Sequence, residues 1–136
     1  MIERKLIAQI TRDFYALYLG KSMMGVTDLL EKYEDYKETD PVVYKLVKTL
    51  ISSLDTTIGV NMDKAMHEIY AFFKKYYEKF PMDDKEWERA IEEASKIGKK
   101  YKDSAWCRQF LIELISIIEL ADKETHEKDG EKKKAA

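Results

Sequence analysis

Apolar residues recur at spacings of three and four along most of the chain, which is the period of an amphipathic helix. The pattern predicts six helices, at about residues 2–19, 27–38, 41–57, 62–80, 84–100 and 104–123. The clearest pattern lies at 62–80, where apolar and aromatic side chains share one face. Apolar and polar residues do not alternate over any stretch long enough to predict a strand.

Residues with special backbone preferences mark several of the helix boundaries. Asp40 before Pro41 predicts a helix start, because proline has no N–H to lose at the first helical position and aspartate can cap. Asn61 is a second candidate cap. Gly20 and Pro81 are expected to end the helices before them, since neither residue favours a helix interior.

The most apolar segment is the last predicted helix, at 104–123. Between Ala105 and Ala121 only five residues are polar, and on a helical wheel they occupy an arc of roughly 140°. They are Arg108, Gln109, Glu113, Ser116 and Glu119. So wide an apolar surface must be covered on two or three sides. We therefore expect an all-α fold, a compact bundle of five or six helices whose last three form an antiparallel up-down series around this central helix.

The composition is that of a well-solvated globular chain. Hydrophobic residues make up 45% and charged residues 37% of the 136 positions, whereas disordered chains lack this apolar share. The length suits one domain with a single core, to which we assign residues 1–123. The residues at 124–136 are charged and offer little to bury, so we expect them to form a disordered tail.

Charge and cysteine usage bear on the compartment. The longest charge-free runs, such as 14–20, are far shorter than the roughly 18 residues that a membrane-spanning helix needs. The opening sequence MIERKL carries charge where a secretory signal needs an apolar run. Cys107 is a lone cysteine inside the most apolar segment, so no internal disulfide can form. We expect a soluble, cytoplasmic protein with no membrane partner.

The sequence lacks the residue patterns that are typical of active sites and metal sites. The tripeptide GKS at 20–22 matches the end of a phosphate-binding loop, but Tyr15 stands where that motif needs its first glycine. The motif also needs a preceding strand, and a helix is predicted there. His67 is expected on the polar face of its helix, four residues after Asp63. The sequence therefore predicts no enzyme, no metal site and no cofactor.

Two lysine clusters raise the question of a nucleic-acid surface. The first, at 74–80, interleaves lysines with aromatic residues, a combination that can bind single strands. On the helical wheel, however, these aromatic side chains point with the core stripe. The second cluster, at 96–102, follows acids at the start of the same helix, and this order complements the helix dipole. A net charge of −2 also argues against a generally basic nucleic-acid binder.

Acidic residues gather on the predicted helix at 27–38. Five of them share one arc of the helix. Four of the five lie three or four residues apart, and like charges at this spacing repel one another by a few tenths of a kcal/mol per pair. They are Asp28, Glu31, Glu34, Asp35 and Glu38. Two interpretations stay open: a solvated charged face, or a docking surface that would accelerate association with a basic partner.

Ile112 is an apolar residue in the middle of the polar arc of the last helix, beside Arg108. Either this arc packs against another helix, or it is exposed and Ile112 anchors an interface. The wide apolar surfaces of several helices also allow a homodimer.

Taken together, these features favour a small non-enzymatic protein-interaction module. We expect an inhibitor or accessory factor that presents its acidic face to a basic partner, such as a nucleic-acid-processing enzyme; small phage and mobile-element products often have this character. The candidate contact residues are the five acids together with Arg108 and Ile112. The alternative is a nucleic-acid-binding regulator that uses the lysine clusters, and nucleic acid is the less favoured partner.

Overall fold

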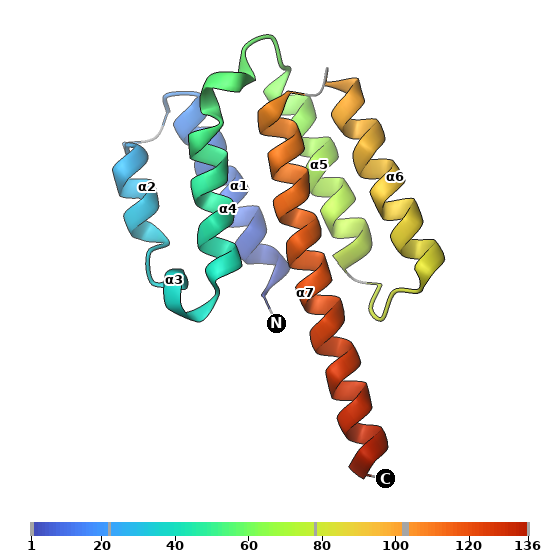
Figure 1. Cartoon of the computed structure of the whole chain (residues 1–136). Coiled ribbons are helices and arrows are strands. Elements are labelled where there is room, and N and C mark those ends of the chain that lie inside the picture. The colour runs from blue at the N-terminus through green and yellow to red at the C-terminus, as the bar shows by residue number, and fades with distance from the viewer. Residues whose placement is uncertain (1, 22, 78, 102–103, 136) are drawn as a thin grey trace.

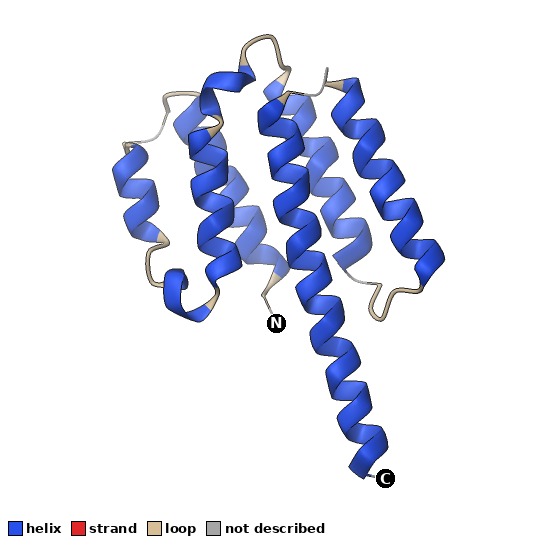
Figure 2. Cartoon of the chain, viewed as in Figure 1, coloured by secondary structure: helices blue, strands red, loops and turns tan. Residues whose placement is uncertain are grey.

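The computed structural model describes the backbone of residues 2–21, 23–77, 79–101 and 104–135, and side chains within these ranges up to residue 125. Over these residues the chain forms seven α-helices and one 3-10 helix, and no strand (Figures 1 and 2). They are α1 (Arg4–Tyr18), α2 (Val26–Lys32), α3 (Tyr36–Thr39), α4 (Pro41–Ser52), η1 (Leu54–Thr57), α5 (Met62–Tyr77), α6 (Asp84–Lys100) and α7 (Ala105–Ala135). The predicted all-α bundle is confirmed.

Helix α7 lies in the middle of the bundle (Figure 1). It packs most extensively against α4, next against α5, and also touches α6 and η1. In the view of Figure 1, α4, α7 and α6 lie in front of α1 and α5, while α2 and α3 cover one side. Helices α5, α6 and α7 run up and down in turn, which confirms the predicted antiparallel series around a central last helix.

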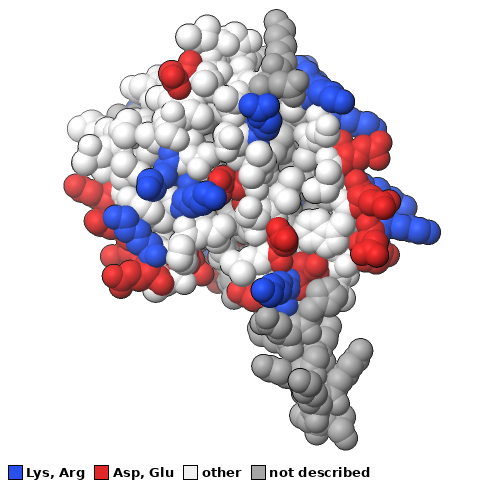
Figure 3. Space-filling model, viewed as in Figure 1, with Lys and Arg blue, Asp and Glu red and all other residues white. Residues whose placement is uncertain are grey.

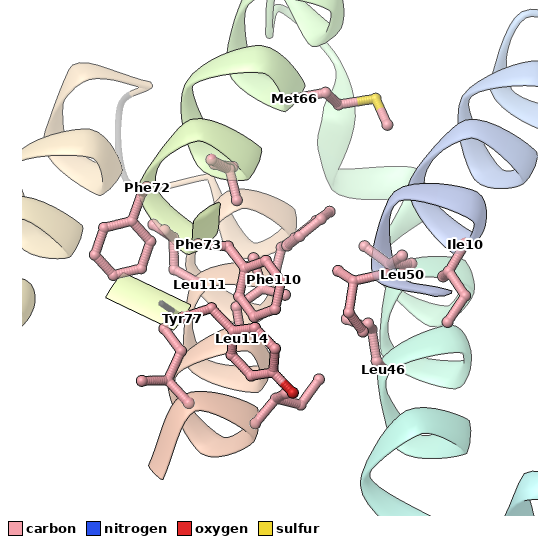
Figure 4. Packing of buried hydrophobic residues seen from close by; sticks show 14 of the residues in the cluster. Ile10, Leu46, Leu50, Met66, Phe72, Phe73, Tyr77, Phe110, Leu111 and Leu114 are labelled. Carbon is pink, nitrogen blue, oxygen red and sulfur yellow. The ribbon is translucent and has the colours of Figure 1, made fainter. Parts of the chain in front are cut away.

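One hydrophobic core joins the helices. Its largest fully buried side chain is Trp106, at the start of α7. The indole stacks on Phe14 of α1, with ring centroids 5.5 Å apart, and meets Phe110 edge-on at 5.2 Å. Figure 4 shows side chains of α1, α4, α5 and α7 converging in the space between these helices. Full burial of each such large side chain stabilises the fold by about 1.5–3 kcal/mol.

Capping residues place two of the helix starts, and a proline marks a third. The Asn61 Oδ1 accepts from the Lys64 N–H at 3.2 Å, and the Asp83 Oδ1 accepts from the Glu86 N–H at 2.8 Å. Helix α4 begins at its proline as predicted, although Asp40 makes no side-chain cap bond. Helix α6 has the predicted bounds. Local sequence signals were therefore sufficient at these boundaries.

The helix predicted at 41–57 ends earlier, at Ser52, and is followed by η1. Three hydroxyls bind carbonyls of the preceding turn, each at 2.7 Å: Ser53 to Thr49, Thr56 to Ser53, and Thr57 to Leu54. Such side-chain bonds compete with the backbone ladder and tighten the last turn.

The prediction of a single helix at 27–38 is wrong, and the described residues form seven α-helices where five or six were predicted. The Tyr33 side chain is 2% exposed, and its hydroxyl donates to the Asp13 Oδ2 of α1 at 2.5 Å. The Lys32 Nζ lies 2.7 Å from the same oxygen. The chain turns more tightly here, through bonds such as Tyr36 N–H to the Tyr33 carbonyl at 3.1 Å. Two side chains drawn to one carboxylate thus outweigh the continuation of α2.

Helix α7 is longer than the segment at 104–123. Its backbone continues as a helix through Ala135 and projects from the bundle (Figure 1), and the disorder expected for 124–136 stays a prediction. A helix that is already nucleated adds one hydrogen bond per residue without any burial, and glutamate and lysine favour helices. The side chains from 126 onward lie outside the described part of the chain, and the domain boundary at 123 stays a prediction.

Candidate interaction surfaces

The five acids singled out in the sequence all have exposed side chains. We call them the acidic edge: Asp28 and Glu31 on α2, Glu34 and Asp35 in the following turn, and Glu38 on α3. Acidic atoms gather over this side of the molecule in Figure 3. Because α2 ends at Lys32, the acids do not share one straight helix face as predicted. They follow a short helix, a turn and a second short helix.

Buried residues on the opposite side of the same segment hold the acidic edge in place. Leu29 and Tyr33 are each 2% exposed and pack into the core. The Asp28 Oδ2 accepts from the Gly25 N–H at 2.9 Å, which ties that carboxylate to the start of α2. Burial raises the pKa of Tyr33, and its hydrogen bond to Asp13 acts in the same direction.

The acidic edge carries a clear excess of negative charge. Residues 28–40 contain six carboxylates and two lysines, a net charge of −4, whereas the whole chain carries −2. Lys32 is bound to Asp13 of α1, whereas Lys37 offsets one acid of the edge: its Nζ lies 3.8 Å from the Glu34 carboxylate and 4.9 Å from the Tyr44 ring centre. The rest of the chain has a net charge of +2.

The part of the polar arc of α7 around Ile112 is exposed, and no other described helix covers it. Ile112 is 46% exposed, and the Arg108 and Glu119 side chains are exposed as well. Leu120, which falls within the same arc on the helical wheel, is 38% exposed. Of the two interpretations of Ile112, packing against another helix is therefore excluded within the described part of the chain.

Glu113 belongs to the polar arc of α7 but is buried, because it is only 3% exposed. Its Oε1 lies 3.5 Å from the Thr49 hydroxyl and 3.7 Å from the Lys45 Nζ, both on α4. Its Oε2 is buried and has no hydrogen-bond partner among the described residues. The wheel placed Glu113 among polar residues but could not show that α4 covers that side of the helix.

Asp122 is a second buried acid, and the sequence pattern did not single it out. It is 7% exposed, and its Oδ1 accepts from the Met82 N–H at 2.9 Å. Its Oδ2 accepts from the Trp87 indole N–H at 3.1 Å. The carboxylate therefore joins α7 to the α5–α6 connection and to α6. A tryptophan near a helix start needs a partner for its indole N–H, and this need of Trp87 was the only sequence feature that pointed to a buried acceptor such as Asp122.

Three of the six described lysines of the two clusters are paired with neighbouring acids. Lys75 and Lys100 form ion pairs with Glu93 and Glu68 across the α5–α6 contact, and the Lys96 Nζ lies 3.7 Å from Glu92. In the first cluster Tyr76 and Tyr77 are buried and Phe80 is half-buried, which confirms that these aromatic side chains point into the core. Lys102 lies outside the described residues.

The residues considered for catalysis also have structural roles. Gly20 has a φ of 71° and ends α1, while Ser22 of the GKS tripeptide lies outside the described residues. His67 is exposed, with its Nδ1 3.6 Å from the Asp63 carboxylate, as predicted. Cys107 is fully buried, and this burial raises the pKa of its thiol to about 11.

The described residues form neither a metal site nor a helix that could span a membrane. They contain no group of three or more histidine, cysteine, aspartate or glutamate side chains placed to hold a metal ion. Within the same residues, no helix is both long and apolar enough to cross a membrane.

A hollow of about 560 Å³ on the outer face of α6 is lined by residues of that helix alone, including Trp87 and Ile91. It does not bring together reactive groups from different elements.

Comparison of the chain with protein-family models, with curated proteins and with solved structures finds no match.

Proposed function

We propose that this chain is a non-enzymatic protein-interaction module that binds the basic surface of another protein through its acidic edge. The observation that carries the proposal is the exposed acidic edge itself, since residues 28–40 hold a net −4 in a chain of net −2. All five acids of the edge are exposed, and buried side chains of the same segment fix their positions. A reducing compartment such as the cytoplasm fits the single buried thiol of Cys107.

The physical cost of the edge supports a role in binding. Like charges three and four residues apart weaken short helices, and α2 and α3 are both short. The same charges would raise the association rate with a basic surface and disfavour acidic ones. An inhibitor or accessory factor of a nucleic-acid-processing enzyme is one protein that would work in this way, because such enzymes carry basic grooves.

The alternative, a nucleic-acid-binding regulator, has less support. Three lysines of the two clusters are in ion pairs with glutamates, and two of the three aromatic side chains beside the first cluster are buried. Base stacking needs exposed aromatic faces, and phosphate binding needs cations that are not already paired.

The experiment is a comparative pull-down from the source cells with a charge-reversed variant. Glu31→Lys, Asp35→Lys and Glu38→Lys together reverse three exposed acids of the edge. We expect a protein with a basic surface to be captured by the wild-type chain, released by rising salt, and lost with the triple variant. Capture of the same proteins in equal amounts by both chains would refute the proposal.

A second triple variant is a control for total charge. Asp55→Lys, Glu88→Lys and Glu92→Lys change the net charge by the same amount at exposed positions away from the edge. This variant should still capture the partner, and circular dichroism should show that both variants are folded. A band shift of nucleic-acid probes at about 50 mM salt that weakens steeply as salt rises would favour the alternative instead.

A further inference from the structure

The exposed arc of α7 contains a second pattern, separate from the acidic edge. Arg108, Ile112, Ile115 and Glu119 follow one another at spacings of four, three and four residues. At about 100° per residue they lie within roughly 60° of one another, so they form one straight stripe along the helix. This spacing is that of the contact positions in a two-helix coiled coil. We call these four residues the α7 stripe.

The side chains of the α7 stripe are placed to meet something outside the chain. Ile112 is 46% exposed, Ile115 is half-buried at the edge of the core, and both charged side chains are exposed. Neither Arg108 nor Glu119 has an ion-pair partner among the described residues. On the face shown in Figure 3, uncharged surface predominates along α7, and charged side chains gather along the α6 side.

The order of the stripe is complementary to itself. When a second copy of α7 is laid antiparallel, with the two-fold axis between Ile112 and Ile115, Ile112 of each copy faces Ile115 of the other. Arg108 of each copy then faces Glu119 of the other, because both residues are equally far from the axis. A parallel arrangement would instead set Arg108 against Arg108 and Glu119 against Glu119. The charges therefore select the antiparallel pairing.

We propose that the α7 stripe is a homodimer interface, in which two copies of the chain pair antiparallel through two central isoleucine contacts and two terminal arginine–glutamate pairs. The stripe spans about 17 Å of helix. A contact along so short a stretch of one helix buries less surface than the roughly 800 Å² per partner of a standard stable interface. The dimer is therefore weak and depends on concentration, with dissociation constants in the micromolar range or above.

The test is sedimentation equilibrium of the full chain at low salt, about 50 mM, over a wide range of concentration. Arg108→Glu or Glu119→Arg alone sets like charges against each other at both ends of the stripe, and should lower the association constant at least about tenfold. The double variant R108E/E119R restores opposite charges in reversed order. It should return the constant to within about threefold of wild type.

A pair of isoleucine variants separates this interface from general hydrophobic association. Ile112→Glu removes the central contact, whereas Ile58→Glu changes an isoleucine that is 90% exposed in the η1–α5 connection. We expect the first to abolish association and the second to leave it within about twofold of wild type. A wild-type chain that stays monomeric at all concentrations, or a double charge variant no better than the singles, would overturn the proposal. These substitutions leave the acidic edge intact, so this outcome is independent of the partner-binding experiment.

Discussion

The buried carboxylate of Asp122 offers the most direct test of how α7 is held to the rest of the bundle. It accepts from the Met82 N–H at 2.9 Å and from the Trp87 indole N–H at 3.1 Å. Asp122→Ala removes both acceptors at once. Met82 is 5% exposed, so its N–H would be left without a partner in a place that water does not easily reach.

The magnitude follows from these two bonds. A hydrogen bond to a charged group contributes about 1.5–3 kcal/mol to stability. The Met82 bond is buried and should contribute within this range, while Trp87 is half-buried and can recover part of its loss by binding water. We therefore expect Asp122→Ala to lower the free energy of unfolding by about 3 kcal/mol, and Asp122→Asn, which keeps one acceptor oxygen, by about half as much. For a chain of this length, the larger loss corresponds to a fall in Tm of about 10 °C.

The assay is urea unfolding followed by far-ultraviolet circular dichroism, because Trp87 fluorescence would itself change in the variants. Lys123→Ala, at the next position on α7, is the matched control: its side chain is exposed, and the change should be within about 0.5 kcal/mol. If Asp122→Ala unfolds with the same free energy as this control, the carboxylate does not hold α7 to the α5–α6 connection, and the reasoning is wrong.

Two further predictions follow from buried ionisable groups. Burial raises the pKa of the Cys107 thiol to about 11, so the thiol should not react with a disulfide reagent at pH 8 in the folded chain. It should react fully after unfolding. Rapid labelling of the folded chain would contradict its burial. Burial raises the pKa of both Tyr77 and Tyr101 to about 12, so folding favours their protonated form. Stability from this source is fully present below pH 10, the unfolded pKa, and should be lost as the pH rises to about 12, which unfolding curves across that range would reveal.

Most of the secondary structure could be predicted from local pattern, because helix starts and helix faces depend on neighbours in sequence. Asn61 and Asp83 bind N–H groups three residues away, so their effect is visible in the sequence alone. The break after Lys32 could not be predicted in this way. It depends on Asp13, a residue of another helix that attracts both Lys32 and Tyr33.

The two candidate surfaces also differ in whether the sequence alone could predict them. The acidic edge was visible in the sequence, because five carboxylates in a short segment cannot all be buried at acceptable cost. That the α7 arc is open could not be known, since the pattern of a helix shows which residues share a face and not which neighbour covers it. Glu113 and Ile112 are adjacent in the chain, yet α4 covers Glu113 and leaves Ile112 exposed.

The sequence by itself thus determined that this chain is helical, where most of its helices begin, and where its acidic residues gather, since all three depend on residue type and local spacing. The tertiary structure alone decided which helix faces stay open and which acids are enclosed. Those outcomes arise from contacts between residues far apart in the chain, such as Asp122 with Trp87 and Glu113 with Thr49. The self-complementary stripe on α7 became a candidate interface only when its helix was seen to be uncovered on that side.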